Sequence, residues 1–206
     1  MFDNLRQLIY SWDKAIFYWI NSDWQNPVLD VVMPFITNFS HWRFPVFLLL
    51  LALIIWGGKK GRWVVVLGVL AVGLSDFTSS QLLKPLFGRV RPCNVLPNVH
   101  LLVGCSKSFS FPSNHAVNFF STALLFSYFY KKTGIFLFVV AILIALSRVY
   151  VGVDYPLDTL AGAIWGSFGA TVILILANKI FRDKIQSARK EKLKWKSEKL
   201  PRFIGA

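Results

Sequence analysis

The sequence predicts an all-α integral membrane bundle with five to six transmembrane helices. Of its 206 residues, 55% are hydrophobic and only 16% are charged, and the mean hydropathy is +0.52. Several apolar runs approach the roughly 20 residues that one helix needs to cross the hydrocarbon core of a bilayer. A soluble domain of this length carries more charge and shorter apolar runs. We therefore expect one compact bundle rather than two domains.

Residues 1–40 are predicted to form short interfacial helices ahead of the main bundle. Between residues 3 and 20, apolar side chains recur at three- and four-residue intervals, with charged residues among them. This pattern is typical of an amphipathic helix that lies in the membrane interface. Asn26 and Pro27 then open a second short helix, which is predicted to end near residue 39. If one of these helices also spans, the bundle has six spans.

The transmembrane bundle is predicted over residues 41–180, with spans at about 41–56, 63–83, 113–131, 134–151 and 156–180. The second half of the second span, 75–81, is polar, so its side chains are expected to face the bundle interior. In the fifth span, Gly162, Gly166 and Ala170 recur every four residues, a small-residue face that allows close helix contact.

The formal net charge of +13 is explained by membrane topology rather than by nucleic acid. Much of the excess lies in residues 181–206, a predicted basic cytoplasmic tail. The short loops at 59–62 and 131–132 are also basic, and five spans put both loops and the tail on one side. By the positive-inside rule that side is cytoplasmic, so the long loop 85–112 faces outward. We expect a membrane and no nucleic acid as partner.

Two cysteines, Cys93 and Cys105, lie in this outward loop. An oxidising compartment would allow them to form a disulfide, whereas spacing alone leaves two unpaired thiols as an equal alternative.

Polar residues that need an explanation gather at the outer ends of the spans. This topology brings them to one depth although they are scattered over about seventy residues: Lys84, Arg89, Arg91, Ser113, Asn114, His115, Arg148, Asp154 and Asp158. The cations supply charge and donors that suit phosphate oxygens. Backbone N–H groups at the start of the third span point at an incoming anion. A histidine there has the unperturbed pKa that suits proton transfer. The pattern predicts a phosphoryl site at the membrane surface.

Three motifs carry a family resemblance: Lys84-PLFGRV-Arg91-Pro92, Pro112-Ser113-Asn114-His115, and Ser147-Arg148-VYVGV-Asp154-YPL-Asp158. Over roughly residues 10–180 the chain resembles the type 2 phosphatidic acid phosphatase (PAP2) family. The resemblance implies a metal-independent phosphomonoesterase or diphosphatase that needs no cofactor and works through a phosphohistidine. It implies a catalytic group of Asp154, His115 and Asp158, with His115 as the general acid and Asp158 as the carboxylate that orients the nucleophile. It also implies a phosphate clamp of Lys84, Arg91, Ser113, Asn114 and Arg148.

Two positions depart from the family pattern. Asn114 replaces a glycine, and its side chain is expected to narrow the site. Asp154 stands where the nucleophilic histidine should be, and we expect it to pair with Arg148 or Lys84 and to occupy the anion pocket itself. Enzymes that use a carboxylate nucleophile on phosphorus usually recruit a divalent metal, and nothing in the sequence resembles a metal site. We therefore hypothesise an inactivated phosphatase, with an engineered His→Asp change as the leading explanation and a natural variant as the other.

The parent activity is expected to be hydrolysis of a phosphate or diphosphate ester on a lipid at the outer leaflet of a bacterial inner membrane. Undecaprenyl diphosphate, phosphatidylglycerol phosphate, phosphatidic acid and the 1-phosphate of lipid A are all candidate substrates. Two alternatives stay open: a lipid-to-lipid phosphotransferase, and a non-catalytic phospholipid-binding protein.

Overall fold

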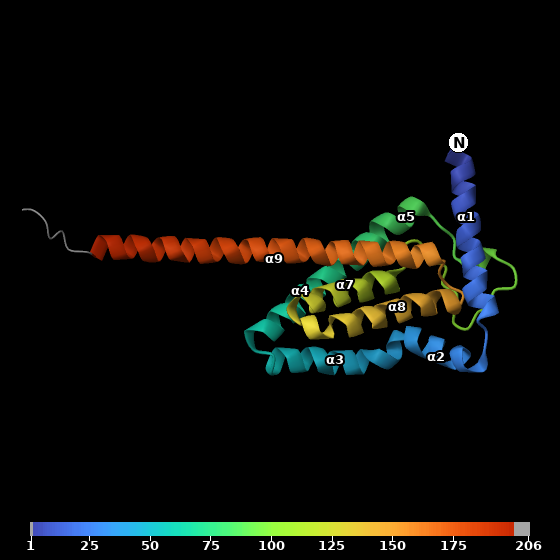
Figure 1. The fold of residues 1–206 in the computed structure, drawn as a ribbon, viewed down its shortest axis with the longest axis horizontal. Helices are drawn as coiled ribbons and strands as arrows, with labels where there is room; N and C mark the ends of the chain where they lie inside the picture. Colours follow the sequence, from blue (N-terminus) through green and yellow to red (C-terminus); the bar gives the residue numbers. More distant parts are fainter. Residues whose placement is uncertain (1, 200–206) are drawn as a thin grey trace, which may run out of the picture.

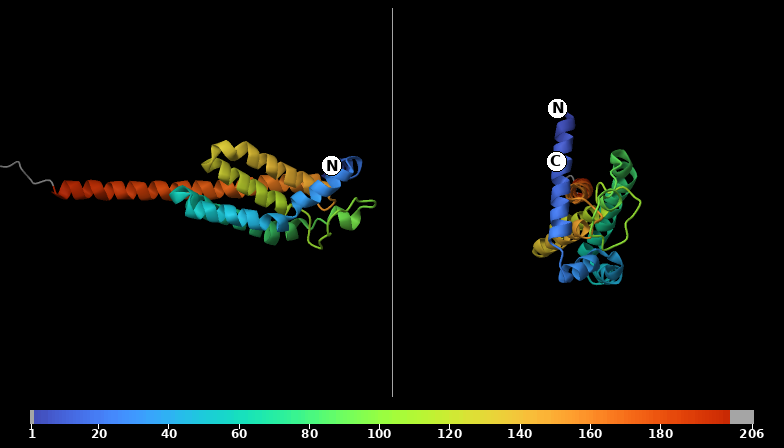
Figure 2. Two further views of the ribbon diagram at one scale, coloured as in Figure 1. Left: turned by 90° about the horizontal axis from the view of Figure 1, so that it is seen from below. Right: turned by 90° about the vertical axis from the view of Figure 1, so that its right-hand side faces the viewer.

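The computed structural model describes residues 2–199, and side chains within residues 4–180 (Figure 1). All regular structure in these residues is helical. The bundle consists of α3 (Phe39–Ile55), α4 (Gly58–Thr78), α7 (Asn114–Phe129), α8 (Gly134–Tyr150) and the first part of α9 (Pro156–Lys199). Figure 2 shows α9 running past the other helices of the bundle, away from the end where α1 lies.

Helices thus occupy all five predicted spans, but not all of them are long enough to cross a bilayer. Among the described residues, the segments Gly58–Val95, Lys131–Tyr150 and Pro156–Ile180 are long and apolar enough. A fourth span results if α2 (Pro27–Thr37) and α3, which are bent by 49° at their junction, act as one. Helix α7 has 16 residues, about 24 Å at 1.5 Å per residue, and so is shorter than a hydrocarbon core of about 30 Å.

Helix α1 (Phe2–Tyr18) lies crosswise at one end of the bundle (Figure 1). Most of its predicted apolar stripe is exposed, including Leu5 (54%) and Trp12 (65%), which fits a helix that meets lipid. On the opposite face of the helix, the side chains of Asp13 and Phe17 are buried in the protein. A π-helical segment, η1 (Trp19–Asp23), then leads to α2.

Helix α2 is fixed to the same end of the bundle through Asp30. The Oδ1 atom of Asp30 accepts a hydrogen bond of 2.6 Å from the Tyr150 hydroxyl at the end of α8 and lies 2.9 Å from Nε2 of His100. Asn26 caps α2 by accepting bonds from the next two amides, those of Val28 and Leu29.

Helices α7 and α9 are in direct backbone contact. A Cβ atom on Gly162 would lie 2.5 Å from the carbonyl oxygen of Ser113, and one on Gly166 would lie 2.0 Å from that of Val117. The small-residue face predicted for the fifth span therefore packs against the start of α7. Ala170, the third member of that face, is buried in the core with Leu125.

The polar end of α4 passes into a π-helical segment, η2 (Ser79–Leu83), and then into α5 (Lys84–Phe87). π-helical turns of this kind are often found at functional sites. The loop that follows contains α6 (Pro92–Val95) and is closed by a disulfide between Cys93 and Cys105, and η3 (Lys131–Thr133) joins α7 to α8. Of the predicted basic tail, the backbone continues α9 to Lys199, and its side chains lie outside the described residues.

Candidate active site

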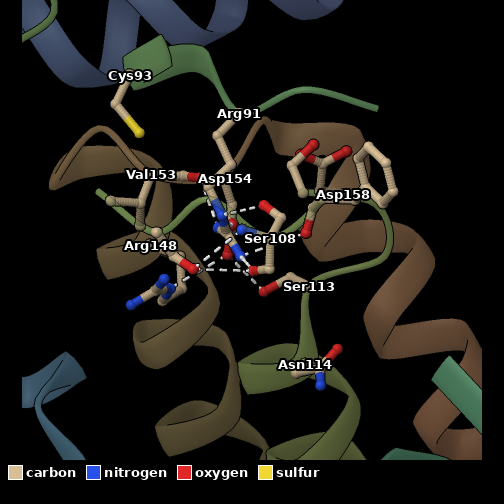
Figure 3. Close-up of polar contacts among 12 residues, drawn as sticks. Arg91, Cys93, Ser108, Ser113, Asn114, Arg148, Val153, Asp154 and Asp158 are labelled. Carbon is tan, nitrogen blue, oxygen red and sulfur yellow. Dashed lines mark hydrogen bonds and ion pairs between the residues drawn. The ribbon is translucent and has the colours of Figure 1, made fainter. Parts of the chain in front are cut away.

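Asp154 lies at the centre of the candidate site, buried with 2% of its surface exposed. One carboxylate oxygen, Oδ1, accepts a hydrogen bond from Nη1 of Arg91. The other, Oδ2, accepts bonds from the Ser113 hydroxyl at 2.7 Å and from Nε of Arg148 at 3.1 Å (Figure 3). Three donors from three separate segments therefore converge on one anionic group.

The turn after α8 brings Asp154 back to this position. The amides of Val153 and Asp154 donate to the carbonyl of Arg148 at 3.2 and 3.3 Å. Gly152 makes the turn possible because its φ of +87° lies in a region that side chains disfavour, and because a Cβ there would meet Val99 at 2.7 Å. The backbone itself therefore fixes the distance between the aspartate and the arginine six residues before it.

Burial alone would raise the pKa of Asp154. The guanidinium groups of Arg148 and Arg91 and the hydrogen bond from Ser113 outweigh burial, so the net pKa lies below its ordinary value of 3.8. The group is therefore a carboxylate at neutral pH, an anion held by donors.

The loop 85–112 holds Arg91 in a fixed orientation. Its Nε donates to the carbonyl of Ser108 at 2.9 Å, and its Nη2 donates to the hydroxyl of the same serine at 3.1 Å. Its Nη1 also donates to the Val153 carbonyl at 2.9 Å. A guanidinium with this many fixed partners is preorganised for an anion and needs no rearrangement to receive one.

Lys84 lies beside this cluster but does not bond to Asp154. Its ammonium donates to the carbonyls of Phe109 at 2.7 Å and Ser110 at 3.4 Å. It is close enough to Arg91 and Asp154 for electrostatic interaction. The predicted pairing of Asp154 with Arg148 or Lys84 is confirmed for Arg148. The second cation is Arg91 and not Lys84, because the two carbonyls of the loop hold the lysine.

His115 opens onto a cavity of about 450 Å³ at the junction of α2 and α3, which Arg148 also lines. Arg148 lies between this cavity and Asp154, since its Nη1 donates to the hydroxyl of Thr37 at 3.1 Å while its Nε holds the aspartate. The histidine interacts with the backbone of Thr37. The imidazole therefore lies at the edge of the anion site, on the same cavity as Arg148.

Asp158 forms a second charged cluster instead of contacting Asp154. Its Oδ1 accepts from Nη1 of Arg89 at 2.7 Å and its Oδ2 accepts from the Tyr155 amide at 2.9 Å. The same guanidinium bonds through Nη2 to Asp13 of α1, whose other oxygen accepts from the Leu157 amide at 2.9 Å. Arg89 therefore links α1, the loop and the start of α9.

The side chain of Asn114 does not narrow the phosphate site, contrary to expectation. Its Oδ1 accepts from Ser79 at 3.0 Å and its Nδ2 donates to Ser80 at 2.6 Å and to Asp76 at 3.0 Å. Figure 3 shows it apart from the charged cluster. The first residue of α7 thus turns toward α4, and its side chain ties the two helices together while its backbone amide stays at the helix start.

The predicted site residues therefore meet at one end of the bundle, with Asp154, Arg91, Arg148 and Ser113 in direct contact and Lys84 and His115 beside them. Their catalytic roles stay predictions. Among the side chains described for residues 4–180, no three His, Cys, Asp or Glu residues form a group suited to a metal ion.

The comparisons with known proteins agree with the motifs. Residues 63–182 match the family described as the PAP2 superfamily. This chain belongs to the PAP2 superfamily. It is 33% identical to phosphatidylglycerophosphatase B of Bacillus subtilis over 181 residues, which cover 81% of this chain and 82% of that protein. Its phosphatase relatives and its long apolar helices place it among membrane-embedded phosphoric ester hydrolases.

Other PAP2 comparisons differ in coverage. The chain is 36% identical to the bacitracin transport permease protein BcrC of Bacillus licheniformis, but the match spans only 59% of each protein. The crystal structure of Aquifex aeolicus LpxE superposes with a TM-score of 0.67 and 30% identity, covering 78% of this chain and 93% of LpxE. The crystal structure of a PAP2-type phosphatidylglycerolphosphate phosphatase from Bacillus subtilis superposes with a TM-score of 0.65 and 29% identity, covering 84% of this chain and 88% of that one, so the PAP2 fold extends over most of the bundle.

Sequence reasoning missed the roles of Arg89, Asp13 and Thr37. Arg89 was grouped with the polar residues at the outer ends of the spans but was given no partner, and Asp13 was one of the charged residues of the amphipathic helix without a role of its own. A carboxylate among apolar residues on a helix that lies in the interface is a signal for a buried partner. No comparable signal marks Thr37, whose hydroxyl contacts Arg148 through the fold alone.

Proposed function

We propose that this chain has the site of a lipid phosphatase, which hydrolyses a phosphate or diphosphate ester on a lipid head group, and that Asp154 leaves the present chain inactive or impaired. One observation carries the proposal. Both oxygens of a buried carboxylate are held by Arg91, Arg148 and Ser113, the residues that the PAP2 motifs assign to the phosphoryl group.

The chemistry follows from these donors. A phosphoryl group in the place of the carboxylate would receive two guanidinium groups, one hydroxyl and the first amides of α7, which neutralise the charge that develops during transfer. A histidine at position 154 would form a bond to phosphorus as the ester P–O bond breaks, and His115 would give its proton to the leaving oxygen. Water would then release phosphate from the phosphohistidine.

Asp154 acts against this chemistry in two ways. Its carboxylate takes the donors that the phosphoryl oxygens need, so a substrate must displace a buried ion pair before it can bind. As an anion it also repels the phosphate that it would have to attack, without a metal ion to offset that repulsion. The chain is therefore expected to bind lipid phosphates weakly and to turn them over slowly or not at all.

The site is proposed to face the outside of a bacterial inner membrane. The basic loops at 59–62 and 131–132 lie at the opposite end of the bundle from the candidate site, and the positive-inside rule makes that end cytoplasmic. The exposed apolar stripe of α1, at the site's end, would then lie in the outer interface.

The test is phosphate release from a panel of lipid phosphates by the full chain and by Asp154→His, in detergent with a chelator present. We expect the histidine variant to release phosphate and the unchanged chain to release little. Asp154→Asn is the matched control, because it removes the charge without adding a nucleophile, and it should stay inactive. Full turnover by the unchanged chain, with none from Asp154→His, would refute the proposal.

The same assay separates the two alternatives. A lipid-to-lipid phosphotransferase would place labelled phosphate on a second lipid with little free phosphate. A lipid-binding protein without catalysis would bind the panel and show no turnover, even with histidine at position 154.

A further inference from the structure

The cavity beside the phosphoryl site holds a cation that no PAP2 motif accounts for. Arg43, in the first turns of α3, lines the same cavity of about 450 Å³ as His115 and Arg148. This volume falls within the roughly 300–1,000 Å³ of ordinary small-ligand pockets. None of the residues that line it is an Asp or a Glu. The cavity therefore presents two guanidinium groups and one imidazole to its contents.

Arg43 has a free guanidinium in the part of the chain that the structure describes: its side chain is exposed and forms no ion pair or hydrogen bond there. By contrast, Arg89, Arg91 and Arg148 are all engaged with carboxylates. An arginine near the end of a membrane helix often extends into the interface alone. Here it lines a cavity with the proposed general acid, so a ligand in that cavity would meet it.

The geometry defines which part of a substrate would lie there. With a phosphoryl group in the place of the Asp154 carboxylate, Arg148 separates that group from the cavity, because it bonds Asp154 on one side and Thr37 on the other. His115, which would protonate the leaving oxygen, faces the cavity. The leaving group, rather than the transferred phosphoryl, therefore enters it.

We propose that Arg43 binds a second anionic group on the leaving-group side of the scissile bond, so that the site favours lipid phosphates whose leaving group is itself charged. The inference rests on the proposed phosphatase function and names its substrate class. Two of the candidate lipids carry an anionic group on the leaving side near the scissile bond: an isoprenyl diphosphate, through the phosphate that stays on the lipid, and phosphatidylglycerol phosphate, through its phosphodiester. Phosphatidic acid and an isoprenyl monophosphate lack it.

The first experiment measures kcat/KM in the Asp154→His background for two matched pairs of substrates. Farnesyl diphosphate is compared with farnesyl monophosphate, and phosphatidylglycerol phosphate with phosphatidic acid. We expect Arg43→Gln to lower kcat/KM for the charged-leaving-group member by roughly 10- to 100-fold, the effect of losing a charge-assisted hydrogen bond, and to change the other member less than about threefold. Arg43→Lys should retain part of the preference. The affected pair tells which lipid supplies the second anion.

Lys107→Gln is the control for long-range charge. Lys107 is an exposed cation of the loop at the same end of the bundle, and it does not line the cavity. Lys107→Gln should leave the ratio of kcat/KM between the two members of each substrate pair unchanged. If Arg43→Gln lowers kcat/KM equally for all four substrates, or if Lys107→Gln has the same effect, Arg43 acts only through long-range electrostatics. Either result overturns the proposal.

A second experiment measures binding without turnover and so separates the two proposals. The full-length variant Asp154→Ala, whose phosphoryl site is vacated, is titrated with the same four lipids, alone and with Arg43→Gln. Tighter binding of the charged-leaving-group lipids that is lost with Arg43→Gln supports the role of Arg43, even if Asp154→His proves inactive. Equal affinity for both members of each pair overturns it. Inactivity of Asp154→His alone counts against the proposed phosphatase function.

Discussion

Two buried aspartates four residues apart, Asp154 and Asp158, illustrate two different uses of a charge. Asp154 receives donors from three segments of the proposed anion site, and Asp158 receives one guanidinium and one amide in a link between α1, the loop and α9. Both carboxylates are nearly inaccessible to solvent. Only the first lies among donors that the family motifs assign to a substrate. Burial and pairing alone therefore do not identify a catalytic carboxylate; the origin of its donors does.

The largest expected effect comes from exchanging the two aspartates for histidine, one at a time. Asp154→His should raise phosphate release by roughly 10³-fold or more, since the loss of a nucleophile typically costs at least that much. Asp158→His should give no gain, because its donors hold helices rather than substrate. Phosphate release from matched lipid substrates checks both. Equal increases in phosphate release from Asp154→His and Asp158→His would contradict the view that only Asp154 lies in the substrate site.

Replacing the arginine of each cluster should lower the stability of the fold by different amounts. Arg89→Gln leaves Asp13 and Asp158 without their cation and should lower the free energy of unfolding by about 3–5 kcal/mol, the usual loss when one partner of a buried pair is removed. Arg91→Gln should cost less, because Arg148 still holds Asp154. Thermal unfolding in a single detergent measures both. The triple variant Arg89→Met, Asp13→Asn, Asp158→Asn should recover part of the loss.

An added anion should distinguish the two sites as well. In Asp154→Ala, inorganic phosphate at about 100 times its Kd should raise stability by roughly 2.7 kcal/mol, whereas the unchanged chain should respond much less because the carboxylate already fills the site. Asp158→Ala should behave like the unchanged chain. A phosphate-dependent shift in the melting temperature measures this, and an equal shift in all three proteins would contradict it.

Protonation of the Asp154 carboxylate, with loss of its ion pairs, should destabilise the fold only at low pH. Because the pKa of this carboxyl is lower in the folded chain than its ordinary value of 3.8, its ion pairs contribute stability above that value. The contribution is lost as the pH falls through the lower, folded-state pKa. Asp154→Asn should therefore flatten the acid limb of a stability profile below about pH 4 and leave the neutral region unchanged. An unaltered acid limb would show that this carboxyl is not held by its arginines.

The smallest expected effect concerns Asn114, whose side chain serves the bundle and not the anion. Asn114→Gly should lower stability by about 1–2 kcal/mol through lost bonds to Asp76, Ser79 and Ser80. In the Asp154→His background it should leave KM nearly unchanged, because glycine retains the backbone amide. A large change in KM would show that the Asn114 side chain takes part in substrate binding, contrary to this expectation.

The sequence predicted the membrane bundle and the meeting of the three motifs because hydropathy and span direction depend on long, regular segments. The sequence predicted the contact partners of individual side chains less well, because a side chain at a helix end can face more than one neighbouring element. Asn114 was expected to face the phosphate, and it faces α4 because η2 places two serine hydroxyls within its reach. Arg89 was recognised as a cation, but its partner Asp13 lies 76 residues away in another helix, and only the fold brings them together. The length of α7 was overestimated mainly at its end, because the helix stops at Phe129 and Lys131 already belongs to η3.

The contact of Gly162 and Gly166 with α7 has a practical consequence for imaging. Helix α9 approaches the start of α7 at backbone distance through these two glycines, and it continues unbroken for 44 residues, about 66 Å at 1.5 Å per residue. A soluble protein fused in helical register near the far end of α9 would keep a fixed orientation relative to the bundle. Such a fusion would supply the particle-alignment mass that a 23.5 kDa membrane protein lacks in electron cryomicroscopy.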